Sequence, residues 1–126
     1  MSPWTDLALT SSSIEGCAKD DPLLTRKALD EAAALYLGEL RRCTPAASPL
    51  YGDLSDLPPV LIHVGEDEIL LDDSLRYADR LDAAGGNAAV HVWAGMTHVF
   101  PTHVGRLKAA GEALDVAGAF LSDLAR

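Results

Sequence analysis

Two short apolar runs stand out in the second half of the chain. Residues 60–64 are apolar except for one histidine, and the run begins and ends with valine. Residues 88–93 form a similar run, and a glycine closes each of the two, at Gly65 and Gly95. Continuous apolar runs of this length, rich in β-branched residues, are typical of strands buried in a parallel sheet. The pattern therefore predicts two such strands.

Three longer segments carry apolar residues at helical spacing, over about residues 22–40, 72–84 and 104–124. Pro22 suits a first helical position, and Asp21 or Thr25 can cap that helix, whereas paired glycines after Ala84 end the second helix. The apolar positions predicted to face inward are Leu24, Ala28, Leu29, Ala32, Leu35 and Tyr36 in the first helix, Leu75, Ala78 and Leu81 in the second, and Leu107, Ala110, Leu114, Ala117, Leu121 and Leu124 in the third.

The order helix, strand, helix, strand, helix predicts one βαβ unit with helices on both sides. A right-handed crossover makes its two strands parallel, and helices on each face give an α/β layer architecture. Residues 10–21 and 43–59, rich in small polar residues and proline, are predicted as connections. The chain has 126 residues, which is the size of one small domain.

The charge balance excludes several classes of partner. Ten Lys and Arg residues stand against 19 Asp and Glu residues, a formal net charge of −9, which disfavours nucleic acid and anionic membranes. Cys17 and Cys43 are too few for a disulfide framework and predict free thiols in a reducing compartment. The sequence shows no leader pattern and no apolar run of about 20 residues, so we expect a cytoplasmic protein without a membrane span.

Acidic residues and a histidine follow the two predicted strands. Residues 65–74 contain a cluster of carboxylates, and residues 95–100 contain His98. Open α/β sheets bind ligands at the carboxyl ends of their strands, and neighbouring strands lie about 4.8 Å apart. A carboxylate after the first strand can therefore reach His98 after the second. Such a pair is the acid–base half of a hydrolytic triad.

The same residues also admit simpler interpretations. A histidine after a strand is more often a surface or packing residue than a catalytic one. The acidic cluster can equally be the start of a helix, where the helix dipole favours negative charge, and Asp72 and Asp73 fit this interpretation best. Metal binding is disfavoured, because the carboxylates lack the spacing of an EF-hand and the histidines lack that of a zincin. No cofactor is indicated.

Five short strings, taken in order, resemble the C-terminal third or more of the hormone-sensitive-lipase family of α/β-hydrolase esterases. The resemblance covers essentially the whole chain. The strings are Ser-Pro-Trp-Thr-Asp at 2–6, Ser-Pro-Leu-Tyr-Gly-Asp-Leu at 48–54, Leu-Pro-Pro-Val-Leu-Ile at 57–62, Val-Gly-Glu-Asp-Glu-Ile-Leu-Leu-Asp-Asp at 64–73, and Trp-Ala-Gly-Met-Thr-His-Val-Phe at 93–100.

The resemblance implies specific roles. His98, in Gly-Met-Thr-His, takes the place of the triad histidine. The family pattern Asp-Pro-Leu-Arg-Asp-Glu-Gly matches residues 68–74 without gaps, so Glu68 takes the place of the triad acid, with a Glu where many members have Asp. Asp67, one residue earlier, is the rival. Because successive residues project in different directions, we expect only one of the two to face His98. Glu66 is expected to point to solvent.

The family's nucleophile and oxyanion segments are not found in the chain. No serine has Gly-x-Ser-x-Gly framing, and there is no His-Gly-Gly segment. We therefore expect residues 1–126 to form a partial α/β-hydrolase domain, the C-terminal part of its sheet, incomplete without the N-terminal half and inactive alone. The whole enzyme would cleave short-chain acyl esters. The alternative is a non-catalytic remnant or association module. Expected partners are a second copy of the chain, which would pair through the edge of strand 88–93, or the missing N-terminal half.

Overall fold

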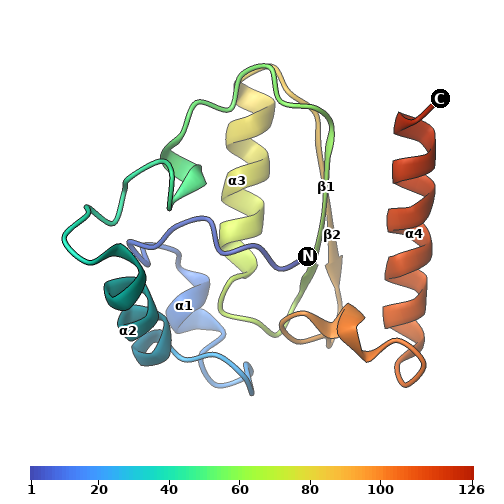
Figure 1. Ribbon diagram of the computed structural model, residues 1–126. Helices are drawn as coiled ribbons and strands as arrows, with labels where there is room; N and C mark the ends of the chain where they lie inside the picture. The colour runs from blue at the N-terminus through green and yellow to red at the C-terminus, as the bar shows by residue number, and fades with distance from the viewer.

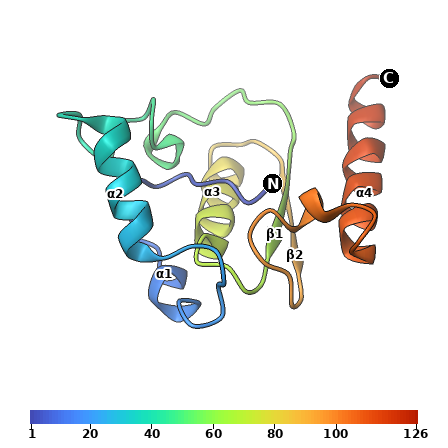
Figure 2. The ribbon, with the colours of Figure 1, turned by 60° about the horizontal axis from the view of Figure 1, so that its bottom comes forward.

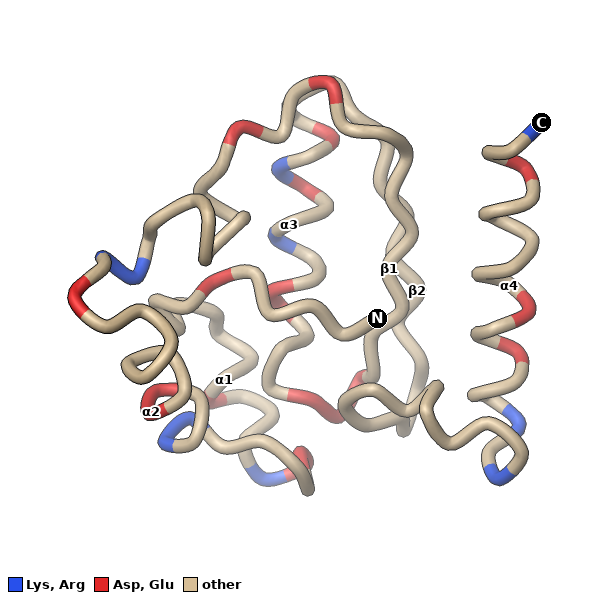
Figure 3. The backbone as a smooth tube through the Cα atoms, in the orientation of Figure 1, with Lys and Arg blue, Asp and Glu red and all other residues tan.

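The computed structural model describes all residues from Met1 to Arg126 and contains a parallel two-stranded sheet. Strand β1 spans Val60–Gly65 and strand β2 spans Ala88–Trp93. They pair in register from Val60 opposite Ala88 to Gly65 opposite Trp93. Neither strand contains a Lys, Arg, Asp or Glu residue (Figure 3). The predicted βαβ unit, and with it the expected α/β class, is confirmed.

Helices cover both faces of this sheet (Figure 1). Helix α3, Leu71–Ala83, connects the two strands and lies on one face, and helix α4, Lys108–Leu124, lies on the other. The turned view in Figure 2 keeps the same layering, with α4 at the end of the molecule opposite α2. No helix of the chain combines the length and apolar character needed to cross a membrane.

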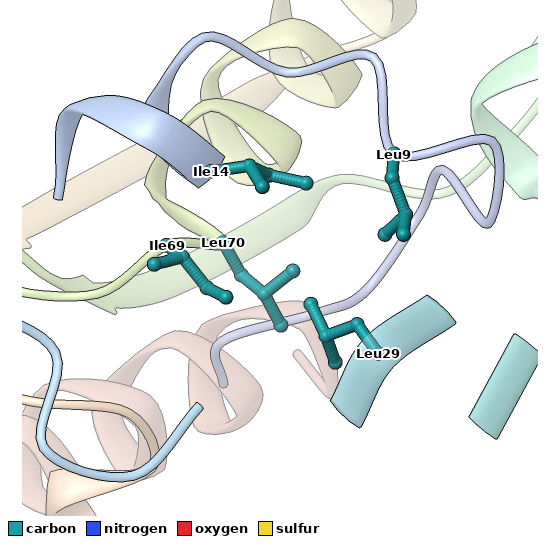
Figure 4. Close-up of a cluster of buried hydrophobic side chains, with 5 residues drawn as sticks. All are labelled: Leu9, Ile14, Leu29, Ile69 and Leu70. Carbon is teal, nitrogen blue, oxygen red and sulfur yellow. The ribbon is translucent and has the colours of Figure 1, made fainter. Parts of the chain in front are cut away.

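Three further elements lie beyond α3 and belong to the N-terminal part of the chain (Figure 1). They are a one-turn helix α1 (Ser13–Gly16), helix α2 (Arg26–Leu37) and a short 3₁₀ turn η1 (Pro49–Tyr51). The main hydrophobic cluster joins this part to the start of α3 (Figure 4). Its members come from three segments of the chain: Leu9 and Ile14, Leu29, and Ile69 and Leu70. Burial of these side chains therefore fixes the N-terminal part of the chain to the turn that precedes α3.

Helix α2 differs from its prediction in length and in its buried face. It begins after Thr25, whose side chain accepts a hydrogen bond from the Ala28 amide, and it ends at Leu37 instead of residue 40. Its buried residues are Leu29, Ala33 and Leu37, one narrow stripe. Leu35 and Tyr36, predicted to face inward, are 87% and 73% exposed, because the chain places nothing against that side of the helix.

The C-terminal helix also differs from its prediction. Residues 100–107 form a separate 3₁₀ turn, η2 (Phe100–His103), and a link, so α4 begins at Lys108 instead of residue 104. Its buried residues are Ala110 and Ala113, which pack on Phe100. The leucines predicted to face inward are at least partly open to solvent: Leu107 is 40% exposed, Leu114 39%, Leu121 63% and Leu124 48%.

Both outer edges of the sheet are open, because β1 and β2 pair only with each other. At the outer edge of β1, the Ser2 amide donates a hydrogen bond to the His63 carbonyl. Beside this edge lies a hollow of about 310 Å³, lined by Met1, Pro3, Thr5, Pro49, Val60, Leu61, Ile62 and Tyr77. A strand edge with unpaired amides and carbonyls is a template for a further strand.

The buried stripe of α2 gives a first prediction. Leu29→Ala should lower the free energy of unfolding by about 2–4 kcal/mol, since it leaves a cavity in the cluster of Figure 4. Leu35→Ala on the same helix is the matched control and should change it by no more than about 0.5 kcal/mol, because Leu35 is exposed. Urea unfolding followed by circular dichroism measures both. Equal losses in the two variants would contradict the assigned face.

Candidate active site

A buried glutamate lies directly beyond the carboxyl end of β1. Glu68 sits in the turn between β1 and α3, and none of its surface is exposed. Its Oε2 accepts hydrogen bonds from the Gly65 amide at 3.0 Å and from the Ser2 hydroxyl at 2.8 Å. Its Oε1 lies 3.3 Å from Nδ1 of His98. A buried carboxylate is stable only when its oxygens are satisfied in this way.

His98 follows β2, in the loop that leads to η2. Its side chain keeps 20% of its surface exposed. Nδ1 is engaged by Glu68, and no group of the chain bonds Nε2. If Nδ1 carries the proton and donates it to the carboxylate, Nε2 has a free lone pair. The ring is thus held at one nitrogen and available at the other.

The two loops are joined through their backbones as well as through these side chains. The Glu66 amide donates to the Trp93 carbonyl, and the Asp67 amide donates to the Met96 carbonyl, both at 3.0 Å. Gly65 lies against the second loop so closely that a Cβ at this position would be 2.2 Å from the Met96 oxygen. Only glycine permits this approach. The sequence pattern marked Gly65 only as the end of a strand.

The two candidate acids, Glu68 and Asp67, differ in their contacts with His98. Glu68 is next to His98, whereas no hydrogen bond joins the Asp67 carboxylate to His98 or to any other group. Asp67 contributes its backbone amide to the loop contact and is half-buried. Glu66 is exposed, as expected, and its carboxylate accepts a hydrogen bond from the Gly95 amide at 3.2 Å.

The acids predicted to start a helix do so. Asp72 and Asp73 lie in the first turn of α3, and Asp73 is fully buried. Asp73 accepts hydrogen bonds from the amides of Thr5 and Asp6 at 2.8 and 2.9 Å and from the Ser11 hydroxyl. Burial raises the pKa of Asp73, against the lowering effect of these bonds. The helix start thus holds the N-terminal segment in place.

Asp6 is a fully buried carboxylate in the N-terminal segment that Asp73 holds. Burial acts to raise the pKa of Asp6, but hydrogen bonds from Thr10, Ala8 and Tyr51 outweigh it and leave the pKa below its ordinary value. Arg76 of α3 adds an ion pair to Asp6 at 3.1 Å. Together with Asp73, this network fixes the course of the chain from Thr5 to Ser11 and therefore the position of the residues just before it.

The other histidines lie apart from the site. His63 of β1 is buried, its Nδ1 accepts a hydrogen bond from the Trp93 indole at 2.9 Å, and its Nε2 has no partner. Burial lowers the pKa of His63, with further contributions from His91 and the terminal amine. His91 and His103 are exposed. Nowhere do three His, Cys, Asp or Glu side chains converge as a metal site would require.

Two aromatic residues flank the loop that carries His98 and pack against each other. Phe100 is buried against Ala110 and Ala113, and the rings of Trp93 and Phe100 lie 5.4 Å apart in a tilted contact. These contacts support the loop that carries His98. Besides the close approach at Gly65, sequence reasoning missed the part that Ser2 plays in the site. Ser2 belonged to the Ser-Pro-Trp string, but nothing in the string indicates that its hydroxyl reaches Glu68.

Comparison with known proteins agrees with this architecture. Residues 1–102 match a family model described as an alpha/beta hydrolase fold. An esterase of Acinetobacter venetianus is 41% identical over 101 residues, 79% of this chain and 33% of the relative. An acetyl-hydrolase of Streptomyces hygroscopicus is 37% identical over 121 residues, 96% of this chain and 40% of the relative.

A solved structure gives the same result. The crystal structure of an esterase from the bacterial hormone-sensitive lipase family superimposes with a TM-score of 0.94 at 40% identity, over 96% of this chain and 41% of that one. The chain belongs to the α/β-hydrolase family, and it is similar to esterases of the hormone-sensitive lipase family. It spans about a third to two fifths of the length of these relatives.

The close approach at Gly65 gives the second prediction. Gly65→Ala should lower the free energy of unfolding by about 1–3 kcal/mol, because the added methyl group would push the Met96 backbone away. Gly111→Ala is the control: a Cβ there meets nothing within 4 Å, and alanine in a helix interior should stabilise by about 0.5–1 kcal/mol. Urea unfolding tests both. A Gly65→Ala variant as stable as the parent chain would contradict the assigned contact.

Proposed function

We propose that this chain supplies the acid and the histidine of a Ser–His–Glu triad in a carboxylic-ester hydrolase. His98 is the general base and acid, and Glu68 is the carboxylate that orients and stabilises it. The serine nucleophile and the oxyanion donors come from the part of the fold that the relatives have beyond the matched region. The 126 residues alone are expected to be inactive, because they contain no Gly-x-Ser-x-Gly motif.

One observation carries this proposal: the contact of 3.3 Å between Glu68 Oε1 and His98 Nδ1, with the carboxylate buried and the ring partly open. A purely structural contact between Glu68 and His98 would not require Nε2 of His98 to be without a partner. In a triad that nitrogen must be free, since it receives the nucleophile's proton. The same contact favours Glu68 as the acid, because Asp67 has no hydrogen bond to the His98 ring.

The geometry supports a standard acyl transfer. The Glu68 carboxylate holds the proton on Nδ1, so Nε2 can accept the serine proton while the serine oxygen bonds to the ester carbonyl carbon. Nε2 then gives this proton to the departing alcohol, which leaves an acyl-enzyme. A water molecule then attacks the acyl carbon while Nε2 accepts one of its protons. Nε2 passes this proton to the serine oxygen as the bond to the acyl group breaks, so the carboxylic acid leaves and the serine is restored. Throughout, the buried carboxylate stabilises the positive charge that forms on His98.

We propose short-chain acyl esters as substrates. The support comes from the relatives, which include a protein named an acetyl-hydrolase and several named esterases. His98 does not line the hollow of about 310 Å³ beside β1. It does not line the second surface hollow either, which is formed by Arg41, Cys43, Thr44 and Pro45. The acyl pocket therefore needs walls from outside these residues.

A chimaera tests the proposal. The region of the Streptomyces hygroscopicus acetyl-hydrolase that matches 96% of this chain is replaced by residues 1–126, and p-nitrophenyl acetate hydrolysis is measured. We expect an active enzyme. His98→Ala and Glu68→Gln should each lower kcat by about 10³–10⁴-fold, because triad members act as a unit.

Asp67→Asn is the matched control for Glu68→Gln, since it makes the same chemical change one residue away. It should keep kcat within about threefold of the parent chimaera, as expected for a residue outside the triad. A folded chimaera without hydrolysis would contradict the proposal. Equal losses in Glu68→Gln and Asp67→Asn would contradict the assignment of the acid.

A second candidate function rests on the open sheet edges. Neither β1 nor β2 has a strand on its outer edge, and such edges pair readily with other strands. The chain would then be an association module, pairing with a second copy through the edge of β2. Light scattering after size exclusion distinguishes the cases. A stable dimer that a proline at Val90 converts to a monomer favours this function, whereas a folded monomer at all concentrations contradicts it.

A further inference from the structure

We propose that Ser2 is a positioning residue for the Glu68–His98 pair. The inference rests on the proposed function, because it concerns how the same acid is aimed at the same histidine. Ser2 lies 66 residues from Glu68 and 97 from Val99, and its side-chain oxygen contacts both. It therefore connects a third segment of the chain to the two loops that carry the pair.

The hydroxyl of Ser2 is used in two directions. It donates a hydrogen bond to Glu68 Oε2 at 2.8 Å, and it accepts one from the amide of Val99 at 3.2 Å. Val99 directly follows His98. A serine hydroxyl offers one donor and two acceptor positions, so it can make both bonds at once. One side chain thus bridges the carboxylate and the backbone of the histidine loop.

The backbone at both ends of this bridge is held in a costly conformation. Ser2 has φ 44° and Val99 has φ 49°, both in the left-handed region that favours glycine. For a β-branched residue such as Val99 this is a clear outlier. Conformations of this kind persist only where surrounding contacts determine them. At Ser2 these contacts include its amide, which donates to the His63 carbonyl of β1 at 2.8 Å.

The bridge has a direct consequence for the carboxylate. Oε2 of Glu68 is occupied by two donors, the Gly65 amide and the Ser2 hydroxyl. Oε1 is left for His98. Without the hydroxyl, Oε2 keeps one donor and the Val99 amide loses its acceptor. The carboxylate is then freer to rotate, and the histidine loop is freer to move away from it.

A merely structural role would give a different result, and Ser11 provides the comparison. Ser11 is as buried as Ser2, at 5% exposure, and its hydroxyl also donates to a buried carboxylate, that of Asp73. Loss of either hydroxyl removes one buried hydrogen bond to a carboxylate. Without the Ser11 hydroxyl, the amides of Thr5 and Asp6 still bind Asp73 and keep the segment that carries Ser2 in place. Only loss of the Ser2 hydroxyl should therefore alter the hydrogen bond at His98 Nδ1.

The test follows the Nδ1 proton of His98 by NMR in the ¹⁵N-histidine-labelled chain, made with a short N-terminal extension that retains Met1. Ser2→Gly removes the hydroxyl and suits the left-handed backbone. Its Nδ1 proton should exchange with water at least about tenfold faster than in the parent chain, the effect of losing one charge-assisted hydrogen bond. Ser11→Ala should leave the exchange rate within about twofold, since it loses a bond elsewhere.

Ser2→Cys keeps a side chain of similar size but offers only a weak hydrogen-bond donor. If Ser2→Gly does not fold, Ser2→Cys takes its place in the test, and the same faster exchange of the Nδ1 proton is expected. In the active chimaera, Ser2→Gly should lower kcat with KM unchanged, and Ser11→Ala should lower neither. Exchange in folded Ser2→Gly or Ser2→Cys as slow as in the parent would overturn the role of Ser2 alone. A parent chain whose His98 carries no protected Nδ1 proton would instead contradict the proposed function.

Discussion

The contact between the two strand ends is the constraint on which the site depends. Parallel strands place their carboxyl ends at one edge, about 4.8 Å apart, but their loops can still diverge. Here they cannot, because Gly65 lies against the Met96 carbonyl with no space for a Cβ, and two further backbone hydrogen bonds join the loops. The distance of 3.3 Å between Glu68 and His98 follows from this contact.

Burial of Glu68 is costly and is compensated locally. An unpaired carboxylate in an apolar interior would take up a proton or destabilise the fold. Glu68 instead accepts bonds from Gly65 and Ser2 and faces His98, so three segments distant in sequence converge on one side chain. The network of Asp6 and Asp73 fixes the segment that brings Ser2 there. The buried carboxylates of Glu68, Asp6 and Asp73 thus fix the positions of the segments that form the site.

The sequence was sufficient for the parts of the fold that depend on local pattern. The strand β2 was predicted residue for residue, and the loop positions of Glu68 and His98 followed from strands of a parallel sheet. The choice between Glu68 and Asp67 needed the family pattern as well, because alternation alone does not say which of two neighbours faces inward. The exposed Leu35 and Leu121 could not be predicted, since an apolar pattern does not reveal whether another segment covers it. Ser2 was missed because its partners are remote in sequence.

The central claim concerns one proton, and the long-range ¹H–¹⁵N spectrum of His98 tests it most directly. In the neutral ring the account predicts the tautomer protonated at Nδ1, with the resonance of that proton shifted by Glu68→Gln and unchanged by Asp67→Asn. A ring protonated mainly at Nε2, or an Nδ1 proton indifferent to the loss of the Glu68 charge, would contradict it.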